Sequence, residues 1–166
     1  MEIRDATDAD LPAITDLYNA LIATTTVAWR DDPTTLDEQA DALALRRREG
    51  YPTLVAEDEG EVIGYTCCTT FRSDRFPGYR HTAELTVHVL ADRHGVGVGS
   101  ALIEALVDRS RAIGLHVLVA AVDADNDASI RFHERLGFTQ VARMPEVGRK
   151  FDRWLTLVLL HRIIDE

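Results

Sequence analysis

The sequence has few of the residues that build a disulfide framework or a metal centre. Its two cysteines, Cys67 and Cys68, are adjacent in a strand-like run. Successive strand residues point to opposite faces, so these thiols cannot readily pair with each other. No Cys or His spacing typical of a metal site occurs. We therefore expect two buried, reduced cysteines, no bound metal and a cytoplasmic protein.

Basic residues are scarce as well. The chain has 18 Lys and Arg against 28 Asp and Glu, which gives a formal net charge of −10. This charge repels nucleic acid and anionic membrane surfaces, so we expect neither as a partner. No apolar run approaches the roughly 18 residues of a membrane span, and the acidic first residues do not resemble a signal peptide. An anionic ligand would need local basic groups, for which Arg93, His94 and Arg131 are candidates. Lys150 is the only lysine, and we attribute that to compositional bias rather than to a role.

Apolar residues are plentiful by contrast. They make up 46% of the 166 residues, enough for one globular domain over residues 1–166. The hydrophobic patterns and turn residues predict helices over 11–22, 35–49, 97–113 and 127–136. They predict strands over 3–6, 53–57, 62–70, 81–90, 117–122, 138–142 and 154–160. The order β-α-α-β-β-β-α-β-α-β-β indicates a mixed α/β domain.

The most informative segment runs from Leu85 to Leu102. A strand-like run leads into His94-Gly95-Val96-Gly97-Val98-Gly99, and Ser100 opens an amphipathic helix. Glycines at every second position free backbone amides to converge on an anion, and the helix start adds partial positive charge. This pattern predicts a pyrophosphate site. A nucleotide-hydrolysing loop would need a Lys after the last glycine, and a dinucleotide fingerprint has the spacing G-x-G-x-x-G. A strand-to-helix turn without a ligand is the alternative.

These residues resemble the GNAT acyltransferases, whose signature Gln/Arg-x-x-Gly-x-Gly/Ala is filled here by residues 94–99. Residues 126–138 are similar to the family's second cofactor motif. Blocks at residues 3–33, 50–52, 78–84 and 144–155 resemble phosphinothricin acetyltransferases and their relatives that act on methionine sulfoximine and methionine sulfone. The resemblance implies a GNAT fold, with a central mixed, largely antiparallel twisted sheet and helices on both faces. It also implies a splayed strand pair that holds acetyl-CoA, and a homodimer.

Acetyl-CoA, as co-substrate, would follow one strand and the glycine loop. The resemblance implies that the strand backbone binds the pantetheine arm and that the loop amides bind the pyrophosphate. His94 departs from the family's glutamine or arginine, which is tolerated if the amides do most of the binding. Capping of the short helix is the alternative for Asn126 and Ser129. The implied cofactor contacts are Val87, His88, Val89, His94, Gly95, Val96, Gly97, Val98, Gly99, Ser100, Asn126, Ser129 and His133.

Two residues are candidates for proton transfer. An amine nucleophile is mostly ammonium at neutral pH, so a group must take its proton, and the resemblance assigns that base to Glu84. His133 stands where many family members carry a tyrosine thought to protonate the departing thiolate. A histidinium could donate that proton. Packing of His133 against the cofactor is the alternative.

Substrate recognition is expected from the loop that follows residue 70. A small amino-acid analogue carries a carboxylate, which an arginine can bind in bidentate fashion. Arg72 and Arg80 are the candidates, although either could be a surface ion-pair partner. Phe151 and Trp154 are expected at a subunit interface or in the pocket wall. The predicted substrate contacts are Phe71, Arg72, Gly78, Tyr79, Arg80 and Glu84.

The sequence thus predicts an N-acetyltransferase that moves an acetyl group directly from acetyl-CoA to a small amino acid or analogue. Methionine sulfone, methionine sulfoximine and phosphinothricin are the substrate types that the resemblance implies. One alternative acceptor is a peptide N-terminus or a polyamine. Another alternative is a CoA-binding sensor without turnover.

Overall fold

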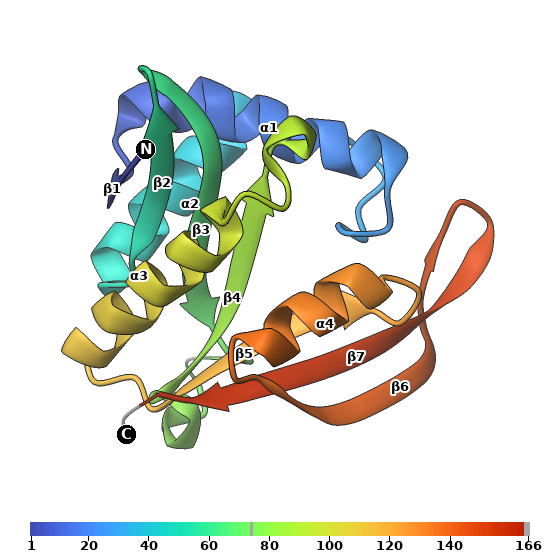
Figure 1. Cartoon of the computed structure of the whole chain (residues 1–166). Helices are drawn as coiled ribbons and strands as arrows, with labels where there is room; N and C mark the ends of the chain where they lie inside the picture. The colour runs from blue at the N-terminus through green and yellow to red at the C-terminus, as the bar shows by residue number, and fades with distance from the viewer. Residues whose placement is uncertain (74, 165–166) are drawn as a thin grey trace.

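The computed structural model describes residues 1–73 and 75–164, which form one seven-stranded sheet flanked by four α-helices (Figure 1). The strand order is β1-β2-β3-β4-β5-β7-β6, with only β4 and β5 parallel. This is the predicted mixed, largely antiparallel sheet. The strands are β1 (Glu2–Asp5), β2 (Thr53–Asp58), β3 (Glu61–Thr70), β4 (Thr82–Val89), β5 (Val117–Asp123), β6 (Thr139–Lys150) and β7 (Arg153–Ile163). The helices are α1 (Leu11–Thr24), α2 (Leu36–Glu49), α3 (Val98–Ala112) and α4 (Asp127–Arg135).

Helix α2 shows how local sequence sets an element's ends. The Thr35 hydroxyl accepts from the Glu38 amide at 3.1 Å, and the Glu38 carboxylate accepts from the Thr35 amide at 2.9 Å. This reciprocal capping box satisfies amides that have no acceptor within the helix. Gly50 ends the helix with φ of 79°, a left-handed conformation that favours glycine. The helix predicted over residues 35–49 is confirmed to within one residue.

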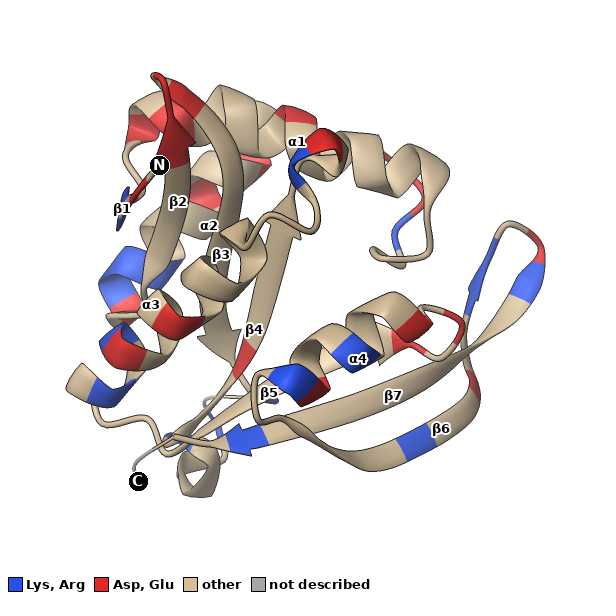
Figure 2. Ribbon diagram, in the orientation of Figure 1, with Lys and Arg blue, Asp and Glu red and all other residues tan. Residues whose placement is uncertain are grey.

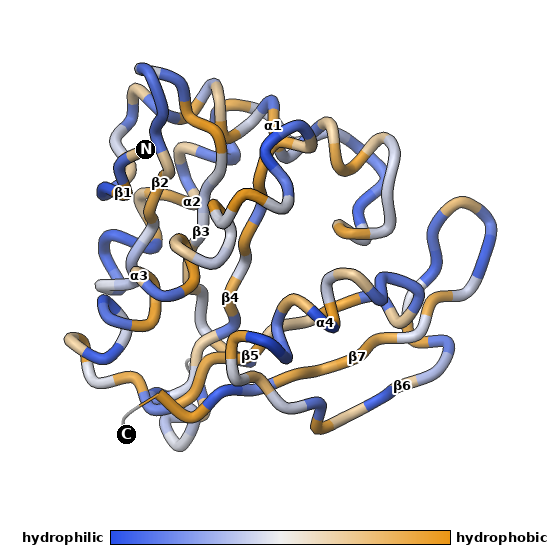
Figure 3. The backbone as a smooth tube through the Cα atoms, viewed as in Figure 1, coloured by the Kyte–Doolittle hydropathy of each residue, from blue (hydrophilic) through white to orange (hydrophobic). Residues whose placement is uncertain are grey.

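Helices cover both faces of the sheet, as predicted. Helices α1 and α2 pack on one face with a core that includes Leu17, Leu43 and Cys67. Helix α3 covers the other face through a larger core that includes Leu106 and Cys68. The two cysteines are therefore buried on opposite faces. Apolar residues follow the inner strands in Figure 3, whereas acidic residues gather at the β2–β3 turn in Figure 2.

The sheet opens between β4 and β5, and this opening positions the site. The two strands pair in parallel from Thr82 opposite Val117 to Leu85 opposite Ala120, where the pairing ends. Strand β4 continues to Val89 with β3 as its only sheet neighbour among the described residues. The expected splayed strand pair is confirmed. Backbone groups along the β5-facing edge of β4 are left available to another partner.

The C-terminal strands are longer than predicted. The strands expected over 138–142 and 154–160 extend to a long hairpin whose turn holds Phe151 and Asp152 at φ of 49° and 57°. Pro145 and Gly148 in the sequence argue against a strand there. The structure accommodates both because β6 is an edge strand whose register with β7 shifts between Met144 and Gly148. No helix of the described residues is long and apolar enough to cross a membrane.

Candidate active site

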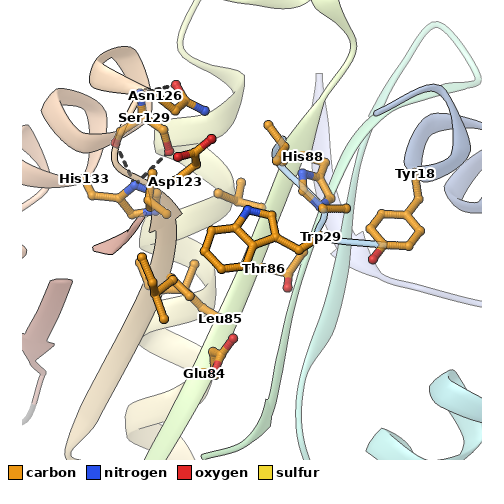
Figure 4. A pocket seen from close by; sticks show the side chains of 17 residues that line it. Tyr18, Trp29, Glu84, Leu85, Thr86, His88, Asp123, Asn126, Ser129 and His133 are labelled. Carbon is orange, nitrogen blue, oxygen red and sulfur yellow. Dashed lines mark hydrogen bonds between the residues drawn. The ribbon is translucent and has the colours of Figure 1, made fainter. Parts of the chain in front are cut away.

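A cavity of about 320 Å³ lies where β4 and β5 separate. Strand β4, the end of β5, helix α4 and the loop after α1 all contribute to its wall. Polar and aromatic side chains converge here from segments far apart in sequence (Figure 4). The lining residues labelled in that view are Tyr18, Trp29, Glu84, Leu85, Thr86, His88, Asp123, Asn126, Ser129 and His133.

Glu84 is the acidic residue of the cavity that has no polar partner. It pairs through its backbone with Val119 of β5, just before the two strands part. No side chain in residues 1–73 and 75–164 forms a hydrogen bond or an ion pair with its carboxylate. Burial therefore raises the pKa of Glu84 without an opposing interaction. A half-buried, unpaired carboxylate with a raised pKa is suited to accept a proton from a ligand.

His133 lines the same cavity from α4 and is only 4% exposed. Its Nδ1 lies 2.8 Å from the Ser129 carbonyl oxygen, so Nδ1 carries the proton that is donated there. Burial lowers the pKa of His133, and the bond to Ser129 opposes that shift. The neutral ring thus leaves Nε2 as an acceptor, and Nε2 is buried with no partner in the described chain. This geometry favours a residue that receives a hydrogen bond over one that supplies a proton.

Asn126 and Ser129 both serve the start of α4. The Asn126 side-chain oxygen accepts from the Ser129 amide at 3.1 Å, which makes Asn126 the N-cap. The Ser129 hydroxyl lies 3.5 Å from Nδ1 of His133. Capping thus uses the Asn126 oxygen and leaves the side-chain amide nitrogen as a possible donor. Because Asn126 and Ser129 both line the cavity, that nitrogen could donate to a ligand bound there.

The glycine loop has the geometry of an anion cradle. Gly95 and Gly97 adopt left-handed φ angles of 79° and 93°, and a Cβ on either would meet no atom within 4 Å. Open space therefore surrounds both, and the first amides of α3 have no acceptor within the helix. Gly99 has another role, because a Cβ there would lie 3.1 Å from Cζ of Phe132. It allows α3 to pack closely against α4.

The three basic residues proposed to help this loop are engaged elsewhere. His94 Nε2 lies 2.9 Å from the Val89 carbonyl oxygen. Arg93 pairs with Asp58 at 3.4 Å, and Arg131 pairs with Asp127 at 3.7 Å. The cradle consequently consists of backbone amides, with Val96 exposed at its tip.

The predicted substrate residues of the β3–β4 loop do not line the cavity. Phe71 and Tyr79 pack edge-to-face with ring centroids 5.8 Å apart, and the Arg72 guanidinium lies 5.5 Å from the Tyr79 ring centroid. Arg80 donates to the Pro77 carbonyl oxygen at 3.0 Å in a short 3-10 turn with Gly78. Strand pairing of Thr69 with Glu84 keeps this loop next to the carboxylate. No arginine or lysine lines the cavity among the described residues.

Several lining residues had no sequence prediction. Trp29 comes from the loop after α1, Tyr18 from α1 and Asp123 from the end of β5. His88 was predicted only for its backbone, yet its ring lies between Tyr18 and Tyr65 with centroids 5.7 and 5.4 Å away. Burial lowers the pKa of His88 to about 4, so this ring is neutral. The sequence signal that could have identified Trp29 is a large aromatic residue in the loop between the first two helices.

Comparisons with known proteins agree with this geometry. The profile of the acetyltransferase (GNAT) family matches residues 14–138. An L-methionine sulfoximine/L-methionine sulfone acetyltransferase of Pseudomonas paraeruginosa is 46% identical over 98% of this chain and 94% of its own length. A phosphinothricin N-acetyltransferase of Streptomyces viridochromogenes is 38% identical over 93% of this chain and 82% of its own. An acetyltransferase of Salmonella typhimurium, solved with its cofactor acetyl-CoA, superposes with a TM-score of 0.95 at 42% identity, covering 100% of this chain and 95% of its own.

Proposed function

The chain belongs to the GNAT family of acetyltransferases, and from that premise we propose that it acetylates the amine of a small amino acid or amino-acid analogue. Methionine sulfoximine, methionine sulfone and phosphinothricin are the acceptor types that the named relatives support. One observation carries the proposal: the unpaired Glu84 carboxylate lies at the point where β4 and β5 part. An acceptor amine and a donor held in that opening would meet at this carboxylate.

The donor is acetyl-CoA, which supplies an activated acetyl thioester, and the residues present fit it. The open space at Gly95 and Gly97 suits the pyrophosphate, which the loop amides would bind from Gly95 to Ser100. Strand β4 has no β5 partner from Val87 to Val89, and this edge suits the amides of the pantetheine arm at every group except the Val89 carbonyl, which faces His94. Asn126 and Ser129 would add polar contacts from α4.

Glu84 would act as the general base. Its raised pKa brings the carboxylate closer to the proton affinity of an amine than an exposed glutamate would be. Glu84 lies one residue before the last β4–β5 pair, at the edge of the opening. From there its carboxylate would take the proton of the amine directly or through one water molecule. The acetyl group would pass directly to the amine, without a covalent enzyme intermediate.

His133 would contact the cofactor rather than protonate the thiolate. Its Nδ1 proton is committed to the Ser129 carbonyl, and burial lowers its pKa, so Nε2 is an acceptor near neutral pH. An N–H of bound acetyl-CoA, or the thiol hydrogen of the CoA product, would satisfy that buried atom. Solvent would then supply the proton that the leaving thiolate takes up.

The β3–β4 loop would recognise the acceptor's carboxylate. Arg72 and Arg80 are the candidate cations among its three arginines, and the loop adjoins Glu84 through the β3–β4 pairing. Phe71, Gly78 and Tyr79 would shape that rim, since Tyr79 carries the Arg72 guanidinium on its ring.

We also propose a cytoplasmic homodimer. The β6–β7 hairpin exposes Phe151 and Trp154, at 55% and 60%, together with Val141, Met144 and Val147. Apolar side chains gathered on one hairpin favour a protein interface. Neither Phe151 nor Trp154 lines the cavity, which leaves the interface role that the sequence suggested. Light scattering coupled to size-exclusion chromatography should give about 37 kDa, twice the 18.5 kDa chain mass, and a monomer would contradict this.

Thiol release from acetyl-CoA tests the function. The acceptors are methionine sulfone, methionine sulfoximine, phosphinothricin, polyamines and peptides with free N-termini. We expect turnover with the amino-acid analogues. Turnover with peptides or polyamines alone would assign the alternative acceptors, and bound CoA without thiol release from any acceptor would indicate a sensor.

A further inference from the structure

The loop that follows α1 covers the cavity, and residues of the C-terminal half hold it there. We call residues 25–29 the acceptor loop, since Val27, Ala28 and Trp29 line the cavity opposite the β4–β5 opening. Contacts within the loop itself are few. The hydroxyl of Thr25 accepts from the Val27 amide at 3.2 Å and donates to the Leu21 carbonyl oxygen of α1 at 2.7 Å. The contacts that hold residues 26–29 come from β5 and β6.

Lys150, the only lysine of the chain, is central to these contacts. It is 3% exposed at the end of β6, and its ammonium donates to the carbonyl oxygens of Ile22, Thr25 and Ala28 at 2.7, 2.9 and 2.7 Å. All three ammonium protons are thereby used. The Ile22 carbonyl is one of those that the end of α1 leaves without a partner, and a cation is favourable at that helix end. The backbone of the acceptor loop therefore wraps around this one charge.

Two further contacts fix the same loop. A Cβ on residue 148 would lie 2.2 Å from Cε3 of Trp29, so the indole packs directly on the β6 backbone at Gly148. The Thr26 hydroxyl donates to the carboxylate of Asp123, a buried residue at the end of β5. Trp29 is thus held between the hairpin and the cavity, among the lining side chains of Figure 4.

We propose that Lys150 is a positioning residue for the acceptor amine: with Gly148 it fixes how far the Trp29 indole projects into the cavity, and so selects small acceptors. This inference takes the amine acceptor from the proposed function, whereas the contacts of Lys150 and Gly148 with the acceptor loop do not depend on it. The hydrogen bonds of Lys150 go to the end of α1 and to the acceptor loop, so its replacement should act on the acceptor and leave the binding of acetyl-CoA unchanged. If Lys150 only stabilised the fold, its replacement would not raise the KM for the acceptor while leaving the KM for acetyl-CoA unchanged.

The test replaces Lys150 by Met, which keeps the stem and removes the three donors. Arg149→Met is the matched control, because Arg149 is exposed and its guanidinium lies against Asp152 and the Trp154 ring, away from the carbonyls that Lys150 binds. We expect Lys150→Met to raise the KM for methionine sulfone roughly tenfold, as misplacement of a substrate wall does, with the KM for acetyl-CoA within about twofold. Lys150→Arg, which keeps a positive charge and hydrogen-bond donors, should raise the KM for methionine sulfone less than Lys150→Met does.

A second readout does not depend on activity. In a Trp154→Phe background Trp29 is the remaining tryptophan, and its emission should shift to longer wavelength in Lys150→Met but not in Arg149→Met. Gly148→Ala should shift the same emission and raise the same KM with Lys150 intact, which covers the case in which Lys150→Met does not fold.

Unchanged Trp29 emission in both variants would overturn the proposal, as would an equal rise of both KM values. If no acceptor in the panel is acetylated, the proposed function fails, whereas the emission measurements still decide whether Lys150 and Gly148 position Trp29.

Discussion

The donor side and the acceptor side of the cavity are built in different ways. Most of the proposed donor side is continuous in sequence, from β4 through the glycine loop into α3, and offers backbone amides, while α4 adds the side chains of Asn126, Ser129 and His133. On the proposed function, the acceptor side joins α1, the acceptor loop, the β3–β4 loop, β5 and the C-terminal hairpin, and offers side chains such as Trp29 and Asp123. A cradle of backbone amides should tolerate a change of side chain such as His94, whereas a wall of side chains can change with a single residue.

This difference suggests a division of labour between a fixed donor site and an adaptable acceptor site. Glycine geometry defines the donor site, so substitutions there should affect acetyl-CoA and spare the amine. Packing and buried hydrogen bonds define the acceptor side, so substitutions there should affect the amine alone. Glu84 lies where the two sides meet and should affect turnover with every acceptor.

Removal of the Glu84 carboxylate should have the largest effect. Glu84→Gln is expected to lower kcat/KM by roughly 10²- to 10⁴-fold for all acceptors, the range of general base catalysis. Glu61→Gln, an exposed position at the far end of β3, is the control and should keep full activity. Full activity in Glu84→Gln would remove the base assignment.

The same variant should be more stable than the wild type at neutral pH. Burial raises the pKa of Glu84 in the folded protein, so the folded state loses stability as pH rises from the unfolded-state pKa through the raised folded value. Glutamine has no charge to bury and escapes that loss. Thermal unfolding at pH 7 should give a higher Tm for Glu84→Gln, and a lower Tm would show that the carboxylate is stabilised by contacts.

Gly97→Ala tests the donor side. A residue with Cβ at a φ of 93° should cost about 1–2 kcal/mol in stability. The altered loop should also raise the KM for acetyl-CoA roughly tenfold, which corresponds to about 1.4 kcal/mol. Gly50→Ala, at a φ of 79° in the C-cap of α2, should lose similar stability with both KM values unchanged. An equal KM for acetyl-CoA in Gly97→Ala and Gly50→Ala would show that the glycine loop does not bind the cofactor.

His133→Asn should give a smaller effect on the same side. Loss of one hydrogen bond to the cofactor should raise the KM for acetyl-CoA about three- to tenfold, while kcat and the alkaline side of the pH–rate profile stay as in the wild type. A fall in kcat of about a hundredfold, with a changed alkaline limb, would restore the role of proton donor.

Arg72→Met and Arg80→Met should show the smallest effects. Both side chains are exposed and already contact the β3–β4 loop, so each should raise the KM for an amino-acid acceptor about two- to fivefold. The matching amino-acid amide, which lacks the carboxylate, should show no change. Arg48→Met on the exposed surface of α2 is the control, and an equal rise for acid and amide would exclude carboxylate recognition.

The donor side could be predicted from sequence because its signals are local. Hydrophobic periodicity, the Thr35–Glu38 capping box and the glycine spacing each act within a few residues. The element order and the opening between β4 and β5 were obtained from these signals together with the family resemblance, and both are confirmed.

The acceptor side could not be predicted because its contacts join residues far apart in the chain. Lys150 lies 122 to 128 residues from its three carbonyl partners, and Thr26 lies 97 residues from Asp123. Composition alone made Lys150 look incidental. The predicted strands 138–142 and 154–160 are shorter than β6 and β7. For β6 the reason is that Pro145 and Gly148 disfavour a strand unless it lies at a sheet edge. The partner of an edge strand is set by tertiary packing, which a single sequence does not reveal.

The ratio of wild-type to Glu84→Gln kcat/KM, measured against pH with methionine sulfone, tests the central claim most directly. A base is needed only while the amine is protonated, so the ratio should be large at neutral pH and should shrink as pH passes the amine's own pKa. A ratio that stays constant across that range would contradict the account, because a residue that only shapes the cavity would slow the reaction equally at every pH.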